Sequence, residues 1–249
     1  MVKNSNIIFG TRPLIEAIES GKEIEKIFLK KGLRGEVFFE LQRLIRHYNL
    51  PFQVVPVEKL NRITRKNHQG VIAFIAPISY QETATLLPGW YESGISPLVM
   101  ILDRLTDVRN MGAIARTAEC AGVNALIVPQ KGSAQINADA IKTSAGALNR
   151  IPVEKAPSLS QSVKFLKDSG LQIVACTEKT DTSYLDIDFT LPTAIIMGSE
   201  ENGIADHLLR MSDHQARLPL QGEIGSLNVS VAAGIILYES VRQRLHKLP

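Results

Sequence analysis

The sequence predicts an α/β protein in two parts, a small α/β domain followed by a larger domain built on a mostly parallel sheet. Along the whole chain, apolar runs typical of strands alternate with amphipathic segments of helical period. In the second part several runs, such as LVMIL at 98–102, are apolar throughout, which indicates strands covered by helices on both faces. The length of 249 residues fits one large domain or two small ones.

The first part, residues 1–77, alternates helix and strand patterns. RPLIEAIES is a short amphipathic segment that stops at Gly21, and IEKIFL alternates as a strand does. The expected elements are a helix at 12–20, a strand at 24–29, a helix at 36–48, and strands at 52–55 and 70–76. This alternation in so short a stretch is typical of a small α/β sandwich.

The stretch 78–97 separates the two parts. It has no clear hydrophobic period, it is rich in turn formers, it contains Pro88-Gly89 and it ends at Pro97. We interpret it as a linker, which gives three segments at 1–77, 78–97 and 98–249.

The last segment repeats the strand–helix alternation on a larger scale. The expected strands are 98–102, 125–128, 171–176, 194–197 and 216–220. The expected helices are 111–121, 138–148, 159–169, 205–211 and 228–245. Strands that alternate with helices predict a mostly parallel sheet with helices on both faces.

The positive charge is concentrated in the first part of the chain. The whole sequence has 28 Lys and Arg against 25 Asp and Glu, whereas residues 1–77 have 13 against 7, a net charge of +6. A basic domain joined to a nearly neutral one is typical of a polyanion-binding domain attached to a second activity. The charge alone is equally consistent with a solvated, lysine-rich surface.

The sequence also excludes several classes of protein. No apolar run approaches the 18–20 residues of a membrane helix, and the N-terminus lacks a secretory signal. Cys120 and Cys176 have no CxxC spacing or neighbouring histidine, and the five histidines lack metal-ligand spacing. We therefore expect no metal site, no disulfide and a cytoplasmic location.

Ligands of parallel sheets bind beyond the carboxyl ends of the strands, so the segments that follow the apolar runs are candidates for a site. The first is DRLTDVRNMGAIARTA at 103–118, with Asn110 as an expected N-cap and Arg116 one to two turns into the helix. A helix start with a nearby arginine can bind an anion. The spacing alone favours an ordinary capped helix with a solvent-facing arginine.

The second segment is IIMGSEENG at 195–203, in which a buried strand runs into Gly198 and is followed by Glu200 and Gly203. Two glycines so close together indicate a tight turn on which a ligand could contact backbone amides. The segment matches neither GxGxxG nor a P-loop. A plain strand-end turn with surface carboxylates explains it equally well.

The third segment is LPLQGEIGSLNVSVAA at 218–233, a glycine-containing loop followed by Ser226 and Asn228 as natural N-caps. Capping alone is enough to explain it. Together, however, the three segments place a glycine-rich turn, a carboxylate, an arginine and capping groups at the strand ends of one sheet.

Jointly these segments resemble the three motifs of the SpoU (TrmH) class of SPOUT methyltransferases, which methylate ribose 2′-hydroxyls of RNA with S-adenosylmethionine. FGTRPLIEAI and HQGVIA are also similar to the L30e-like RNA-binding domain of a subgroup of this class. One departure is Val108, where the family often has proline before the motif asparagine. The matching motif positions are Asn110, Gly112, Ala113, Arg116, Met197, Gly198, Glu200, Gly203, Pro219 and 226–230.

The resemblance implies a trefoil-knotted, parallel-sheet SPOUT domain after a small L30e-like domain, a homodimer, and a role in rRNA processing, most similar to enzymes that methylate a guanosine of 23S rRNA. It implies a catalytic cluster of Asn110, Arg116, Glu200, Ser226 and Asn228. It implies cofactor contacts from Thr177, Met197, Gly198, Gly203, Leu218, Leu220 and Leu227. The expected RNA contacts are Arg62, Arg65, Lys66, His68 and Gln69.

Three alternatives stay open at the level of sequence. The substrate could be tRNA instead of rRNA. The chain could be a non-catalytic RNA-binding assembly factor, although Arg116, Glu200 and Asn228 are intact. It could be a nucleotide- or phosphate-binding enzyme of another α/β class, which the absence of a P-loop and of GxGxxG disfavours.

Overall fold

The structure is a computed structural model that describes residues 7–246. It divides into two compact units, Met1–Ser79 and Tyr80–Pro249, and each is described by itself. The first six residues of the expected N-terminal domain lie outside the described residues. None of the described helices is long and apolar enough to span a membrane.

The N-terminal unit is a four-stranded mixed sheet in the order β1-β4-β2-β3. Strand β4 is antiparallel to both β1 and β2, whereas β2 and β3 are parallel. The strands are β1 (Ile7–Phe9), β2 (Ile24–Lys30), β3 (Phe52–Val55) and β4 (Val71–Ile75). The helices are α1 (Thr11–Glu19), α2 (Glu36–His47) and α3 (Val57–Ile63).

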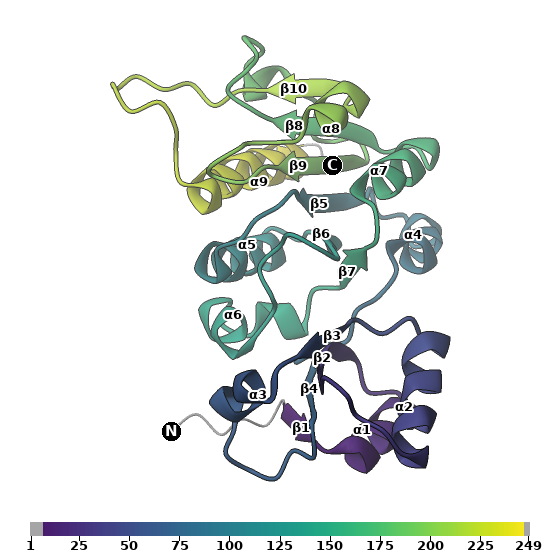
Figure 1. Ribbon diagram of the computed structural model, residues 1–249. Helices are drawn as coiled ribbons and strands as arrows, with labels where there is room; N and C mark the ends of the chain where they lie inside the picture. The colour runs from purple at the N-terminus through teal and green to yellow at the C-terminus, as the bar shows by residue number, and fades with distance from the viewer. Residues whose placement is uncertain (1–6, 247–249) are drawn as a thin grey trace. The chain divides into compact units, whose positions relative to one another are not determined.

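The two faces of this sheet are covered unequally (Figure 1). Helices α1 and α2 pack their apolar sides, including Leu14 and Leu41, against Ile27 and Ala73. Within the described residues, the other face carries one helix, the short α3, whose Leu60 is fully buried in a smaller cluster. The difference follows from length, because α3 spans seven residues and α1 and α2 span nine and twelve.

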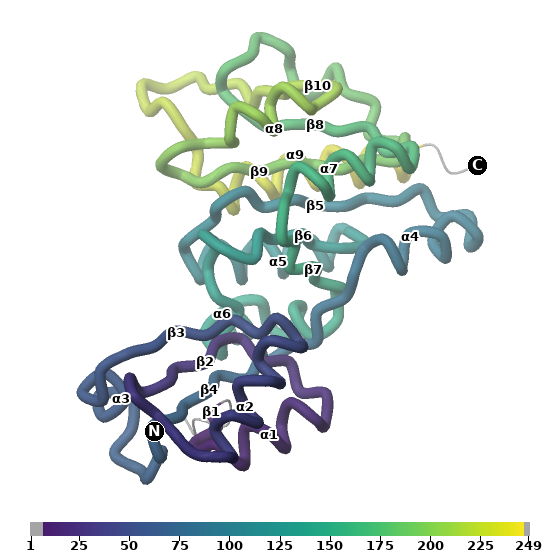
Figure 2. Tube along the Cα trace, turned by 45° about the vertical axis from the view of Figure 1, so that its right-hand side comes forward, coloured from purple at the N-terminus to yellow at the C-terminus, as the bar shows by residue number. Residues whose placement is uncertain are grey.

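The C-terminal unit is a six-stranded sheet in the order β10-β8-β9-β5-β6-β7 (Figure 2). Every pair of neighbouring strands in it is parallel. The strands are β5 (Leu98–Leu102), β6 (Ala125–Pro129), β7 (Val153–Ala156), β8 (Gln172–Cys176), β9 (Thr193–Met197) and β10 (His214–Ala216). The central strands β5 and β9 are buried along their whole length, as their continuous apolar sequences predict.

Helices cover both faces of the C-terminal sheet (Figure 1). The described helical segments of this unit are α4 (Thr83–Glu92), α5 (Val108–Cys120), α6 (Ala138–Thr143), α7 (Leu159–Asp168), α8 (Asp206–Met211), α9 (Val229–His246) and the 3-10 turns at Ala147–Asn149 and Tyr184–Asp186. Helices α4, α7 and α8 share one core cluster with the strands, whereas α5 packs against α6 and α9. The sheet with helices on both faces agrees with the predicted α/β class.

The structure differs from the sequence expectation at several places. Part of the expected linker 78–97 is helix α4, whose Leu87 is buried in the core; Pro88-Gly89 had indicated a turn. The expected strand at 216–220 is wrong, because β10 ends at Ala216 and the segment after it is a loop. Strands β1 and β7 and helix α3 are further elements that the sequence analysis does not include.

Candidate active site

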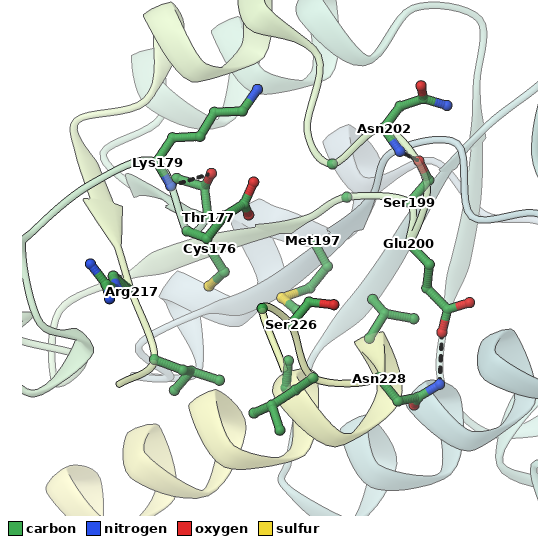
Figure 3. A pocket seen from close by; sticks show the side chains of 18 of the residues that line it. Cys176, Thr177, Lys179, Met197, Ser199, Glu200, Asn202, Arg217, Ser226 and Asn228 are labelled. Carbon is green, nitrogen blue, oxygen red and sulfur yellow. Dashed lines mark hydrogen bonds between the residues drawn. The ribbon is translucent and has the colours of Figure 1, made fainter. Parts of the chain in front are cut away.

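A cavity of about 540 Å³ opens at the carboxyl ends of β8, β9 and β10 (Figure 3). Three chain segments form its walls: the turn after β8, the loop at 198–203 after β9, and the segment from Ala216 to the start of α9. These strands are neighbours and parallel, so their carboxyl ends share one edge of the sheet. The cavity lies where the fold class predicts a ligand site.

The loop at 198–203 doubles back on itself at the cavity wall. Ser199 donates its backbone N–H to the Gly203 carbonyl at 3.2 Å, and the Gly203 N–H returns a bond to the Ser199 carbonyl at 2.9 Å. A Cβ atom on Gly198 would lie 2.2 Å from the Gly203 carbonyl carbon, so only glycine fits there. Gly203 has φ of +61°, which also favours glycine. The tight turn presents Glu200 at its tip.

Glu200 joins the three candidate segments through one carboxylate oxygen. Asn110 Nδ2 donates to Glu200 Oε1 at 2.8 Å, and Asn228 Nδ2 donates to the same oxygen at 2.7 Å. Asn228 Nδ2 also lies 3.1 Å from Asn110 Oδ1, which closes the cluster. Figure 3 shows Glu200 and Asn228 directed toward one another from different segments. The second carboxylate oxygen of Glu200 is not used by these two amides.

A second set of bonds holds the far end of the same loop. The Asp103 carboxylate is buried and accepts the Ala205 backbone N–H at 2.8 Å. Arg104 contacts both Asp103 oxygens at 3.1 Å and donates to the Gly203 carbonyl at 3.3 Å. Arg104 has φ of +54°, a left-handed conformation that is uncommon for a residue with a side chain. The end of β5 is thereby tied to the loop that carries Glu200.

The structure brings most of the expected site residues together. All seven expected cofactor contacts line the cavity, and so do Glu200, Ser226 and Asn228. Asn110 reaches the cluster from α5 but is not its N-cap as expected; that position is Asp107, whose Oδ1 accepts the Arg109 N–H at 2.6 Å. Helix α5 begins three residues earlier than the apolar pattern indicated, which places Asn110 inside its first turn.

Arg116 is the exception among the expected catalytic residues. It lies six positions after Asn110 on α5, is exposed, and does not line the cavity. At 3.6 residues per turn a spacing of six puts the two side chains on different sides of the helix.

The expected RNA contacts in the N-terminal unit fall into two groups. Arg62, Arg65, Lys66 and Gln69 are exposed at the end of α3 and in the turn that follows. His68 is buried: its Nε2 pairs with Asn61 Oδ1 at 2.9 Å, and its Nδ1 accepts the Gly70 N–H at 3.0 Å. His68 holds the turn, and only the other four are free to contact a partner.

Sequence reasoning missed several residues that line the cavity. They are Cys176, Glu178, Lys179, Ser199, Asn202 and Arg217. Only their position could have identified them, because each lies at or just after the end of β8, β9 or β10. Burial raises the pKa of the Cys176 thiol to about 12, so the thiol stays protonated at neutral pH and is a poor nucleophile. Within residues 7–246, no cluster of three or more His, Cys, Asp or Glu side chains could hold a metal ion.

Comparison with known proteins assigns both parts of the chain to described families. Residues 97–238 match the SpoU rRNA Methylase family, and residues 7–81 match the RNA 2′-O ribose methyltransferase substrate binding family. A putative TrmH family tRNA/rRNA methyltransferase of Staphylococcus haemolyticus is 33% identical over 238 residues, 96% of each chain. Its counterpart in Staphylococcus epidermidis is 34% identical over 242 residues, 97% of each chain.

Solved structures show the same relationship. The SpoU methyltransferase AviRb from Streptomyces viridochromogenes, in complex with the cofactor AdoMet, superposes with a TM-score of 0.62 and 25% identity, over 96% of this chain and 90% of that one. The A. aeolicus TrmH/SpoU tRNA modifying enzyme has a TM-score of 0.56 and 32% identity, over 61% of this chain and 77% of that one.

Proposed function

Because the chain belongs to the SpoU rRNA methylase family, we propose that it transfers a methyl group from S-adenosylmethionine to a ribose 2′-hydroxyl of RNA. The observation that supports this most strongly is the convergence of three separate segments on Glu200, at the wall of one cavity. A methyl transfer needs the acceptor oxygen to be held in line with the bond that breaks, and a rigid cluster at the cavity wall can hold it there.

The residues present in the cavity fit S-adenosylmethionine, the cofactor of the family. The volume of the cavity is in the range of small-molecule sites, and its walls combine apolar side chains with polar and charged ones. Leu218, Leu220 and Leu227 would contact the apolar parts of the cofactor, and the close turn at Gly198 lets backbone atoms approach it. The bound cofactor supplies a methyl group already activated by its sulfonium. Everything else in the reaction falls to the chain and the RNA.

The chain's own residues have two tasks, to orient the acceptor ribose and to stabilise its oxygen as the proton leaves. Glu200, held by Asn110 and Asn228, orients the acceptor nucleotide at the cavity mouth. Arg116 binds the RNA phosphate and stabilises the developing negative charge on the ribose oxygen. A guanidinium stays protonated in proteins, so Arg116 is a poor choice for the base itself.

For the N-terminal unit, the proposal is an L30e-like RNA-binding domain that holds the substrate. Its support is the net charge of +6 in residues 1–77 and the exposed Arg62, Arg65 and Lys66. Replacing these three side chains by alanine should reduce the dependence of RNA affinity on salt by about one unit of slope for each phosphate that is no longer bound. An unchanged slope would show that they are only a solvated surface.

The proposal extends to a homodimer and to the family's trefoil knot near the C-terminus. Helix α9 buries one side in its own unit and leaves Val231, Ile235 and Tyr238 exposed on the other. These positions are spaced by four and three residues, so they form one apolar stripe that a second subunit could cover. For the knot, the support is that 198–203 and the segment before α9 line the same cavity.

For the substrate we propose a guanosine of 23S rRNA in the cytoplasm, because the two-domain layout is most similar to that of RlmB. The experiment is to map 2′-O-methylation, as resistance to alkaline cleavage, in total RNA of a deletion strain and its parent. A single lost site in 23S rRNA supports the full proposal. A lost site in tRNA would show that the substrate is tRNA and not 23S rRNA. An unchanged methylation map, together with no binding of S-adenosylmethionine, would indicate a non-catalytic assembly factor.

A further inference from the structure

The face of the N-terminal sheet beneath α3 is unusually rich in aromatic side chains. Phe9 is in register with Ile72 and Phe28 with the same residue, so both phenylalanines lie on one face. Phe74 is in register with Ile7 and with Lys26 and shares that face. We call the surface formed by Phe9, Phe28 and Phe74 the aromatic face.

Two rings of the aromatic face, Phe28 and Phe74, are in contact, and Phe9 and Phe74 are only partly covered. Phe28 and Phe74 meet edge to face, with ring centroids 5.9 Å apart and planes at 89°. Phe28 is buried against α3, while Phe9 and Phe74 are half-buried. Helix α3 is the one helix packed on this face within the described residues, and it is too short to cover all three rings.

Three lysine ammonium groups stand over these rings. Lys26 Nζ lies 4.9 Å and Lys59 Nζ 5.0 Å from the centroid of Phe28. Lys66 Nζ lies 5.7 Å from the centroid of Phe9. Among the described strand residues that the register puts on this face, none is an aspartate or glutamate. The aromatic face therefore combines π surface with positive charge.

Interleaved rings and cations are the chemistry that recognises an unpaired nucleic-acid strand. Bases of a single strand stack on aromatic side chains while lysines contact the neighbouring phosphates. Bases of a duplex are stacked on each other and cannot use the rings. Lysine stems can swing off a ring at little cost, since the ammonium group regains a partner when it meets a phosphate.

We propose that the aromatic face binds an unpaired segment of the RNA substrate, with bases stacked on Phe9 and Phe74 and with Lys26, Lys59 and Lys66 on the phosphates beside them. This rests on the proposed function only in taking RNA as the partner. The surface is continuous with the exposed Arg62 and Arg65, since Lys59 and Arg62 belong to α3 and Lys66 follows it. The bound strand would run from the rings onto that basic turn.

The test measures binding of the full-length chain to a 12-nucleotide oligouridine and to an RNA duplex of equal length, by fluorescence anisotropy. The doubly substituted Phe9→Leu/Phe74→Leu chain keeps apolar volume but loses the stacking surface. We expect it to bind the single strand at least about tenfold more weakly than the wild type. Binding of the duplex should change less than that of the single strand. The matched control is Phe52→Leu: Phe52 is exposed and in register with Ile27, on the opposite face, so it should change binding by less than about twofold.

A second pair of variants keeps the test decisive if the phenylalanine changes unfold the unit. Lys26→Gln/Lys59→Gln leaves the core intact and should reduce the salt slope of oligouridine binding by about two. The control is Lys22→Gln/Lys31→Gln, two exposed lysines outside the aromatic face, which should leave the slope unchanged. If the two double variants have the same salt slope of oligouridine binding, the proposal is wrong.

Direct contact is read from photocrosslinks between 4-thiouridine RNA and the full-length chain, mapped by mass spectrometry. Adducts on Phe9 or Phe74 support the proposal, and adducts restricted to other surfaces contradict it. Displacement of oligouridine by polyglutamate as effectively as by RNA would indicate an acidic protein partner and would also contradict it.

Methyl incorporation into total RNA by the wild-type chain is measured in parallel. If methyl is incorporated while the phenylalanine and lysine variants bind like wild type, the aromatic face is wrong and the proposed function stands. If no methyl is incorporated but the variants lose single-strand binding as expected, the aromatic face stands and the proposed function is wrong.

Discussion

Asn228 uses the two ends of one side-chain amide for different partners, of which Glu200 is one. Its Nδ2 donates to Glu200 Oε1 at 2.7 Å, while its Oδ1 accepts the Ser230 backbone N–H at 3.0 Å and so caps helix α9. The position of α9 is thereby coupled to the orientation of the carboxylate at the cavity wall. The coupling can be separated by substitution, because the two functions need different atoms.

Asn228→Asp should lower kcat and cost less free energy of unfolding than Asn228→Ala, because it keeps the helix cap. The aspartate still accepts the helix N–H groups, but it replaces the donor to Glu200 with a second negative charge. If Glu200 moves, the acceptor ribose is no longer held in line, and such a displacement costs on the order of 10²-fold in rate. Asn228→Ala should lower kcat and also reduce the free energy of unfolding by about 1 kcal/mol, since it removes the cap of α9. Steady-state kinetics and urea unfolding of the two variants check this; equal stability losses would contradict it.

Arg116→Ala should abolish methyl transfer to RNA and leave the affinity for S-adenosylmethionine within a few-fold. Arg116 is exposed and does not line the cavity, and in the proposed mechanism its partner is the RNA and not the cofactor. The two quantities are read by isotope incorporation and by calorimetric titration of the cofactor. Near-wild-type turnover in the variant would remove Arg116 from the mechanism.

Gly198→Ala should prevent cofactor binding. The new methyl group would lie 2.2 Å from the Gly203 carbonyl carbon and 2.3 Å from the Ile204 nitrogen, so the loop at 198–203 has to open. The matched control is Gly225→Ala, on the same cavity, where an added Cβ meets nothing within 4 Å. Calorimetric titration should find no binding for the first variant and near-normal binding for the second.

The proposed dimer predicts a sedimenting mass of about 55 kDa, twice the chain mass of 27.4 kDa. Tyr238→Glu should shift the equilibrium to the monomer, because Tyr238 is 54% exposed in the subunit and belongs to the apolar stripe of α9. Lys164→Glu, on the exposed side of α7, serves as the control for a change in surface charge. A monomer of wild type at micromolar concentration would contradict the dimer.

Acid should destabilise the fold through Glu239 on α9. Hydrogen bonds from Arg242, at 2.8 and 2.7 Å, lower the pKa of this buried carboxyl below its usual range; burial opposes that shift and a bond from Gln243 adds to it. A lowered folded-state pKa favours the carboxylate, so its contribution is complete above the unfolded pKa and is lost as pH falls through the folded one. In Glu239→Gln, thermal unfolding below about pH 4.3 should depend less steeply on pH.

The sequence was sufficient for the location of the site but not for its internal bonds. Parallel strands end at a common edge, so the alternating pattern alone predicts that the segments with Asn110, Glu200 and Asn228 meet. Their shared use of one carboxylate oxygen depends on side-chain geometry that no spacing encodes. Leu218 and Leu220 show the opposite case: both line the cavity, although they lie in a loop and not in the strand that their apolar pattern predicts.

Tertiary contacts explain what local sequence could not predict. Arg104 adopts a left-handed backbone because Asp103 and the Gly203 carbonyl hold its guanidinium, and the Gly203 carbonyl lies far from it along the chain. Helix α4 contains Pro88-Gly89 and is maintained by the burial of Leu87. In both cases packing overrides a local preference that, taken alone, predicts another structure.

The cluster around Glu200 can also form only late in translation, because its members lie far apart in the sequence. Asn228 lies 118 positions after Asn110, so at about 5–20 residues per second it is added about 6–24 s later. Until then Glu200 lacks one of its two donors and the cavity lacks the wall formed before α9. A chain that ends before Asn228 therefore lacks the complete cluster at the cavity wall.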